Sequence, residues 1–257
     1  MSEQSAKPFL VRGLYEWCVE QGYTPYLAVR VNSKTRVPAA FVKNGEIVLN
    51  VGPLATHQLK MDNDWVLFNA SPDLLTQIRA NPALQPGRAL RDTGIAGVVL
   101  IDAQIDHTTG LFMLREGKPL PVWCTPQVRE DLTTGNPIFN VLSHFCTVRW
   151  QPVQVTPPQA FEVPGVAGLR FTPVPLSSKA PPYSPHRHDP HPGDNIGVLI
   201  EDAASGRKAF YAPGFGAMEP HLEPFLADSD CVLLDGTFWT DDEMIRLGIS
   251  TKTAREI

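Results

Sequence analysis

The sequence is poor in cysteine, in long apolar runs and in clusters of basic residues, and each shortage argues against a class of protein. Its four cysteines, Cys18, Cys124, Cys146 and Cys231, are far apart and form no C-x-x-C pair. This spacing argues against a disulfide framework and against a zinc knuckle. No apolar run approaches the length of a membrane span, and a net charge of −5 without a basic cluster argues against a nucleic-acid partner. The N-terminus lacks the charged-then-apolar pattern of a signal peptide, so we expect a cytoplasmic protein.

The sequence does contain enough apolar residues for a core, and it is rich in proline. An apolar content of 43% over 257 residues is compatible with one large domain or two smaller ones. Proline is about twice as frequent as in an average protein and concentrates in the second half of the chain. We therefore expect long, rigid loops in that half.

The first quarter of the chain predicts a helix followed by short strands. Apolar residues lie on one face of a helix over residues 8–21, and Gly22 is a natural stop. This face could pack on its own domain or form a dimer contact. Residues 26–31 read as a strand, and Asn44-Gly45 between two further apolar runs is a strong hairpin signal.

Polar residues suited to chemistry stand at the ends of three later apolar segments. Residues 98–101 run into Asp102, and residues 231–234 run into Asp235. Residues 196–200 follow a loop over residues 184–195 that holds three of the seven histidines. An α/β fold places chemistry where polar loops meet buried strands. The three strand ends together predict one metal site assembled from distant parts of the chain.

The first of these strand ends has the frame of the H-x-H-x-D-H motif of metallo-β-lactamase-fold hydrolases. Here the first two positions are Asp102 and Gln104, and the last two are Asp106 and His107. A neutral amide is a poor zinc ligand, so we do not expect the two-zinc hydrolytic site. Asp106, His107, a loop histidine and Asp235 remain, and such a set suits a single Fe(II) with open positions or a single zinc.

The loop histidines and their neighbours have both functional and structural interpretations. His191 best matches the next metal-binding histidine, because a glycine follows it closely at the strand entrance. His186 and His188 could instead contact the ligands or the substrate. Asp194 and Asn195 could do the same, or they could only cap a turn.

Two further residues of the proposed site have equally ordinary structural alternatives. Asp102 could merely orient a neighbouring histidine, and Asp235 could be a polar strand end. His57, His144 and His221 have no comparable neighbours and are expected to be ordinary surface or core residues.

From about residue 65 to residue 257 the chain resembles the coenzyme PQQ synthesis protein B family. The matching motifs occur in order and include residues 67–73 (LFNASPD), 104–111 (QIDHTTGL), 178–186 (SKAPPYSPH), 189–195 (DPHPGDN), 211–214 (YAPG) and 234–237 (LDGT). The resemblance implies a metallo-β-lactamase-like αββα sandwich that acts in pyrroloquinoline quinone (PQQ) biosynthesis. It implies an iron- and O₂-dependent hydroxylase of a cross-linked Glu–Tyr intermediate, or a role in transport of PQQ or its precursor.

The same resemblance implies roles for individual residues. Asp106, His107, His191 and Asp235 would hold the metal, which is Fe(II) or alternatively zinc. Asp102 and Gln104 would stand close to it and share in catalysis with Asp106 and His107.

Residues 7–64 resemble a different family, stringent starvation protein B. The matches are residues 8–17 (PFLVRGLYEW), 22–26 (GYTPY) and 45–51 (GEIVLNV). Members are adaptors that deliver tagged peptides to the ClpXP protease. The resemblance implies a dimerising helix followed by the opening strands of a small barrel, and hence a homodimer and a degradation-tag peptide as partners.

Together the two resemblances predict a fusion of two partial proteins that meet near residues 63–69. We expect an adaptor-like segment over residues 1–64 and a PQQ-biosynthesis domain over residues 65–257. The fold class is α/β (α+β): an αββα sandwich incomplete at both ends, preceded by a helix and a partial small β-barrel. Three functions remain open, namely a metal-dependent oxidoreductase of PQQ biosynthesis, a peptide-binding protease adaptor, and an inactive fusion.

Overall fold

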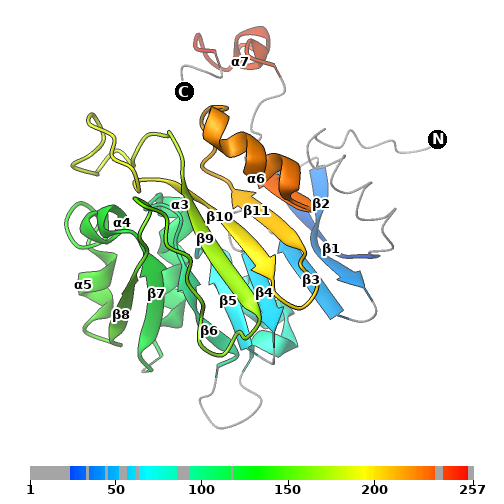
Figure 1. Ribbon diagram of the computed structural model, residues 1–257. Helices are drawn as coiled ribbons and strands as arrows, with labels where there is room; N and C mark the ends of the chain where they lie inside the picture. Colours follow the sequence, from blue (N-terminus) through cyan, green and yellow to red (C-terminus); the bar gives the residue numbers. More distant parts are fainter. Residues whose placement is uncertain are drawn as a thin grey trace.

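The protein is a sandwich of two β-sheets with helices on the outer faces (Figure 1). The structure, a computed structural model, describes the backbone of residues 24–32, 35–43, 46–51 and 57–61. It also describes, with most of their side chains, residues 64–85, 93–116, 118–234 and 240–253. The helix predicted over residues 8–21 and the predicted ligand Asp235 lie outside the described residues.

In the described ranges, one sheet contains eight strands in chain order. They are β1 (Thr24–Asn32), β2 (Thr35–Lys43), β3 (Glu46–Val51), β4 (His57–Met61), β5 (Asp64–Phe68), β6 (Ile95–Val99), β7 (Leu120–Cys124) and β8 (Val148–Pro152). Strands β1 to β5 are antiparallel neighbours, whereas β5 to β8 are parallel. Lys43 pairs with Glu46, which confirms the hairpin predicted between β2 and β3.

The N-terminal strands belong to the same sheet as the parallel strands. Strand β4 pairs with β5 over its whole length, from His57 opposite Phe68 to Met61 opposite Asp64. The resemblance to stringent starvation protein B implied the opening strands of a small barrel here, and in the described residues these strands continue the larger sheet. The physical reason is that β5 offers an edge on which β4 completes its backbone hydrogen bonds.

The second sheet has four strands in the described part, in the order β12-β11-β10-β9. Their bounds are β9 (Leu169–Pro175), β10 (Ile196–Asp202), β11 (Lys208–Ala212) and β12 (Cys231–Leu234). Strands β11 and β12 run parallel, and the other neighbours are antiparallel. Short apolar runs at residues 169–174, 196–200, 209–211 and 231–234 predict a strand at each place, and the structure confirms all four.

Aromatic rings fill the space between the two sheets. The Phe68 ring lies 5.8 Å from that of Phe171 and 5.4 Å from that of Tyr211, measured between ring centroids. Side chains alternate along β5, so Phe68 faces this inner core while Leu67 faces the helices.

Short helices cover the outer faces of both sheets (Figure 1). Those near β5 to β8 are α2 (Leu74–Ala80), η1 (Pro82–Leu84), α3 (Ile105–Thr108), η2 (Thr109–Leu114), α4 (Pro126–Asp131) and α5 (Ile138–Leu142). On the other side lie η3 (Pro220–Leu222) and α6 (Glu223–Asp228), followed by α7 (Glu243–Arg246) near the end of the chain. The layered arrangement confirms the predicted αββα sandwich. Among the described residues, no helix is both long and apolar enough to span a membrane.

Ser71-Pro72 and Thr125-Pro126 each predict a helix start with the hydroxyl residue as N-cap, and the structure confirms only the second. Thr125 caps α4, because its hydroxyl accepts a hydrogen bond from Val128 N at 3.2 Å. Ser71 was predicted to cap α2, but that helix begins at Leu74 with Asp73 at the cap position. Ser71 instead lies in a turn, where its carbonyl oxygen accepts a hydrogen bond from Leu74 N. It stays outside the helix because the residue before it, Ala70, is hydrogen-bonded to the backbone of His107 and Gly110.

The packing of the inner core predicts that truncating a phenylalanine inside it lowers the stability of the protein far more than truncating an exposed one. Phe68 is 0% exposed and Phe145 is 59% exposed. We expect Phe68→Ala to lower the free energy of unfolding by about 3–5 kcal/mol, because it removes a packed ring and leaves a cavity. Phe145→Ala should change it by less than about 0.5 kcal/mol. Urea denaturation of both variants checks this, and equal effects would contradict the packing described.

Candidate functional site

A buried aspartate–histidine pair lies just beyond the end of β6. Asp102 is 1% exposed, and its Oδ1 lies 2.6 Å from His107 Nδ1. The same oxygen accepts a hydrogen bond from Gln104 N at 2.9 Å. A carboxylate on Nδ1 fixes the ring of a histidine and directs Nε2 toward a ligand. Asp102 therefore makes the contact that an orienting residue requires.

The chain leaving β5 holds this pair in place. Ala70 N donates to His107 O at 2.6 Å, and Gly110 N donates to Ala70 O at 2.8 Å. Asn69, in the left-handed region with φ of 59°, accepts from Ile101 N at 3.1 Å through Oδ1. These bonds fix both ends of the segment that carries the pair.

The second sheet contributes two buried polar side chains, those of Tyr211 and Asn195, next to the Asp102–His107 pair. Asn69 Nδ2 donates to the Tyr211 hydroxyl at 3.3 Å. Burial raises the pKa of Tyr211 well above its usual value, and the charge of Asp102 adds to the rise. The phenol therefore stays protonated at neutral pH.

Asn195 enters the site at the start of β10. Its Nδ2 donates to Ser178 O at 3.0 Å, and the next residue, Ile196, donates its N–H to Ile101 O at 2.9 Å. A Cβ added to Gly214 would lie 3.5 Å from Asn195 Oδ1 and 3.6 Å from Asp102 Oδ2. These two oxygens therefore border the space beside Gly214.

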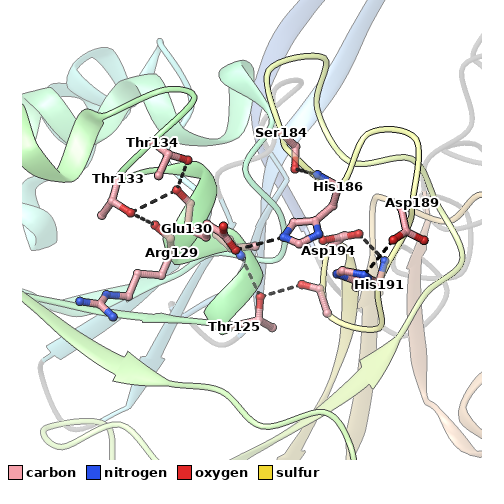
Figure 2. A network of polar contacts seen from close by, with 12 residues as sticks. Thr125, Arg129, Glu130, Thr133, Thr134, Ser184, His186, Asp189, His191 and Asp194 are labelled. Atoms are coloured by element: carbon pink, nitrogen blue, oxygen red, sulfur yellow. Dashed lines mark hydrogen bonds and ion pairs between the residues drawn. The ribbon is translucent and has the colours of Figure 1, made fainter.

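The histidines of the loop gather at a different place, against α4. His186 Nε2 lies 3.1 Å from Glu130 Oε2, and the rings of His186 and His191 are 4.2 Å apart between centroids. His191 Nε2 lies 3.4 Å from Asp189 Oδ2, and Figure 2 shows these side chains in one polar network. His188 is exposed.

The structure thus brings the predicted site residues together in two groups. Asp102, His107 and Asn195 lie around the end of β6, with Gln104 and Asp106 at neighbouring positions in the chain. His186, His191 and Asp194 form the second group. Within the described residues, no three His, Cys, Asp or Glu side chains are arranged to hold a metal ion.

Asn69 and Tyr211 belong to the site but were not predicted as site residues. Each lies in a motif that carried the family resemblance, residues 67–73 and 211–214. The available signal was a polar residue at the end of a buried strand, the same signal that identified Asp102.

Comparisons with known proteins support both resemblances. The family model described as Beta-lactamase superfamily domain matches residues 64–256, and that for Stringent starvation protein B matches residues 5–73. Coenzyme PQQ synthesis protein B of Nitrosococcus oceani is 60% identical over 199 residues, covering 76% of this chain. The protein of the same name from Methylobacillus flagellatus is 60% identical over 195 residues, also covering 76%.

The chain spans 64% of the length of each of these two curated relatives. A solved structure, Zn(2+)-bound PqqB from Methylobacterium extorquens, is 32% identical with a TM-score of 0.65. That match covers 78% of this chain and 66% of the other. It supports the same sandwich fold for the second segment.

Gly110 is predicted to tolerate no side chain. A Cβ there would lie 2.1 Å from Ser71 O and 2.8 Å from Ala70 O, so the backbone holding His107 would have to shift. We expect Gly110→Ala to destabilise the protein by about 1–3 kcal/mol, measured by thermal denaturation. Gly214→Ala is the matched control, because its Cβ would meet only ordinary contacts. The packing would be misassigned if Gly214→Ala were the more damaging change.

Proposed function

The chain belongs to the β-lactamase superfamily, and from this premise we propose that it acts in PQQ biosynthesis as a metal-dependent enzyme. The observation that carries the proposal is the buried Asp102–His107 pair at the end of β6, at 2.6 Å. It lies in the segment that is 60% identical to the curated PQQ synthesis relatives.

The donors at this strand end suit a single metal ion. Asp102 occupies Nδ1 of His107, so Nε2 is the nitrogen that would coordinate. Asp106 adds a carboxylate from the adjacent position. His191 and Asp235 are the other proposed ligands, although His191 lies in the group against α4 and Asp235 outside the described residues. A mixed imidazole and carboxylate set fits Fe(II) or Zn²⁺. Fe(II), when bound, would supply the activation of O₂ that hydroxylation requires.

The protein's own residues would orient the ligands and the substrate. Asp102 keeps the His107 ring fixed with Nδ1 as the protonated nitrogen. The Tyr211 hydroxyl and the Asn195 amide are buried polar groups beside it, suited to hold a polar substrate atom. Gly214 leaves space next to Asp102 Oδ2. On the helix that carries His107, the first residue, Ile105, is 64% exposed.

The proposed reaction is hydroxylation of the tyrosine ring in a cross-linked Glu–Tyr intermediate. Transport of PQQ or its precursor is the alternative within the same pathway. Incubating the Fe(II)-loaded full chain with the intermediate, O₂ and a two-electron reductant such as ascorbate would yield a product heavier by one oxygen if the enzyme proposal is correct, with the second oxygen atom of O₂ released as water. Tight binding of PQQ without turnover would favour transport.

A second candidate function is peptide binding by the N-terminal segment. The match of residues 5–73 to stringent starvation protein B supports it, together with the antiparallel strands β1 to β3. The proposed partners are a degradation-tag peptide and a second copy of the chain. The fluorescence anisotropy of a labelled tag peptide would rise on binding, and the absence of a rise at high micromolar protein would remove this candidate. An inactive fusion would show neither peptide binding nor turnover.

The metal proposal predicts distinct effects for three substitutions. After anaerobic Fe(II) loading and removal of loose metal, we expect about one iron per chain, because a formed ligand set retains its ion. His107→Ala should lose it, and Asp102→Asn should weaken metal affinity by about 10- to 100-fold, because it removes the carboxylate that orients the ligand. Metal analysis of the purified variants measures this.

His144→Ala is the matched control, because His144 is an exposed histidine beside α5. It should retain the metal content of the parent protein. If His107→Ala retained as much iron as His144→Ala, the proposed ligand role of His107 would be wrong.

A further inference from the structure

Two buried carboxylates lie near the His-rich loop. Asp131, at the end of α4, is 0% exposed, and Asp194, just before β10, is 1% exposed. Within the described part of the chain, Oδ1 of Asp194 has no hydrogen-bond partner, and the side-chain oxygens of Asp131 have the Ser184 hydroxyl beside them but form no well-aligned hydrogen bond. Burying a charged group without compensation is strongly unfavourable. Something must neutralise or coordinate these oxygens.

The Asp131 and Asp194 carboxylates lie close enough for their charges to interact. Burial raises the pKa of Asp131, the Ser184 hydroxyl opposes this rise, and the charge of Asp194 adds to it. Gln127 lies one helical turn before Asp131 on the same face of α4. Its Oε1 is also buried without a partner, and lies 2.8 Å from where a Cβ on Gly193 would be.

The nearby arginines are directed to other groups. The guanidinium of Arg129 lies 4.3 Å from the centre of the Trp150 ring, and Figure 2 shows it pointing away from the loop. Arg187 donates from Nη1 to Ala180 O at 2.6 Å. The imidazole of His186 is directed to Glu130, with 3.1 Å between Nε2 and Oε2. Negative charge therefore predominates in this part of the described structure.

The frame around these oxygens is fixed by the backbone. Thr125 caps α4 and also donates from its hydroxyl to Gly193 O at 2.6 Å. Gly193 has φ of +105°, a conformation that side chains disfavour. His191 N donates to Asp194 Oδ2 at 2.6 Å, which leaves Oδ1 as the unpaired oxygen. The acceptors are thus held in place before any ligand arrives.

We infer that Asp131, Asp194 and Gln127 form a binding site for a hard divalent cation such as Ca²⁺ or Mg²⁺. Four buried oxygen acceptors of two carboxylates and an amide are the ligand type that such ions prefer. This site differs in its donors from the proposed Fe(II) or zinc site around His107. Binding would join α4 to the loop that carries His186 and His191.

Calorimetric titration of the EDTA-treated full chain with CaCl₂ and with MgCl₂ tests this inference. We expect saturable binding of one of these ions with about one site per chain, and a higher melting temperature in its presence. Asp131→Asn and Asp194→Asn should each weaken binding at least tenfold. Asp131→Asn should also be no less stable than the parent without cation, because it removes a buried charge. Loss of binding would then not reflect unfolding.

Two controls separate this site from its surroundings. Asp189→Asn removes a carboxylate of the same loop that is 89% exposed, and it should leave cation binding unchanged. His107→Ala should also bind Ca²⁺ or Mg²⁺ like the parent, so this inference and the metal proposal above can fail separately. The inference is overturned if neither ion binds, or if Asp131→Asn binds as tightly as the parent. It is also overturned if the melting temperature is unchanged by both ions and rises on acidification, because a proton shared by Asp131 and Asp194 would then neutralise the two carboxylates.

Discussion

The bonds made by the Asn69 side chain are the constraint on which the candidate site depends. Asn69 stands at the end of β5, is fully buried, and bonds to Ile101 N beyond β6 and to the Tyr211 hydroxyl of the opposite sheet. One side chain therefore links two neighbouring strands of the first sheet and one strand of the second. The segment with Asp102 and His107 begins at Ile101, so its position follows from these bonds.

Much of the fold could be predicted because it rests on local patterns. The short apolar runs at residues 65–68, 169–174 and 196–200 predict β5, β9 and β10, and Asn44-Gly45 predicts the hairpin between β2 and β3. Strand β7 and helix α5 were not predicted. The run Leu120–Cys124 contains a proline, and Ile138–Leu142 spans little more than one helical turn. Tertiary packing against the helix-side core stabilises both, and such packing leaves little trace in a short sequence window.

Individual residues of the candidate site could be predicted from the sequence, but which of them lie together could not. The sequence singled out Asp102, His107 and the loop histidines, because polar residues followed apolar strands. It could not tell that His186 and His191 meet Glu130 of α4, since that contact joins residues 56 positions apart. Asp131 gave no signal either. Its place in the inferred cation site rests on the complete burial of its carboxylate, which is a property of the packed structure alone.

Strand β5 lies where the two family matches meet within one sheet. Its one edge pairs with β4 in antiparallel register and its other edge with β6 in parallel register. The two family matches overlap at residues 64–73, which contain this strand. The Phe68 ring packs against Phe171 and Tyr211, and the Asn69 side chain bonds to Ile101 and Tyr211. These partners all come later in the chain, so the described contacts that position His107 are made by β5 and the residues after it.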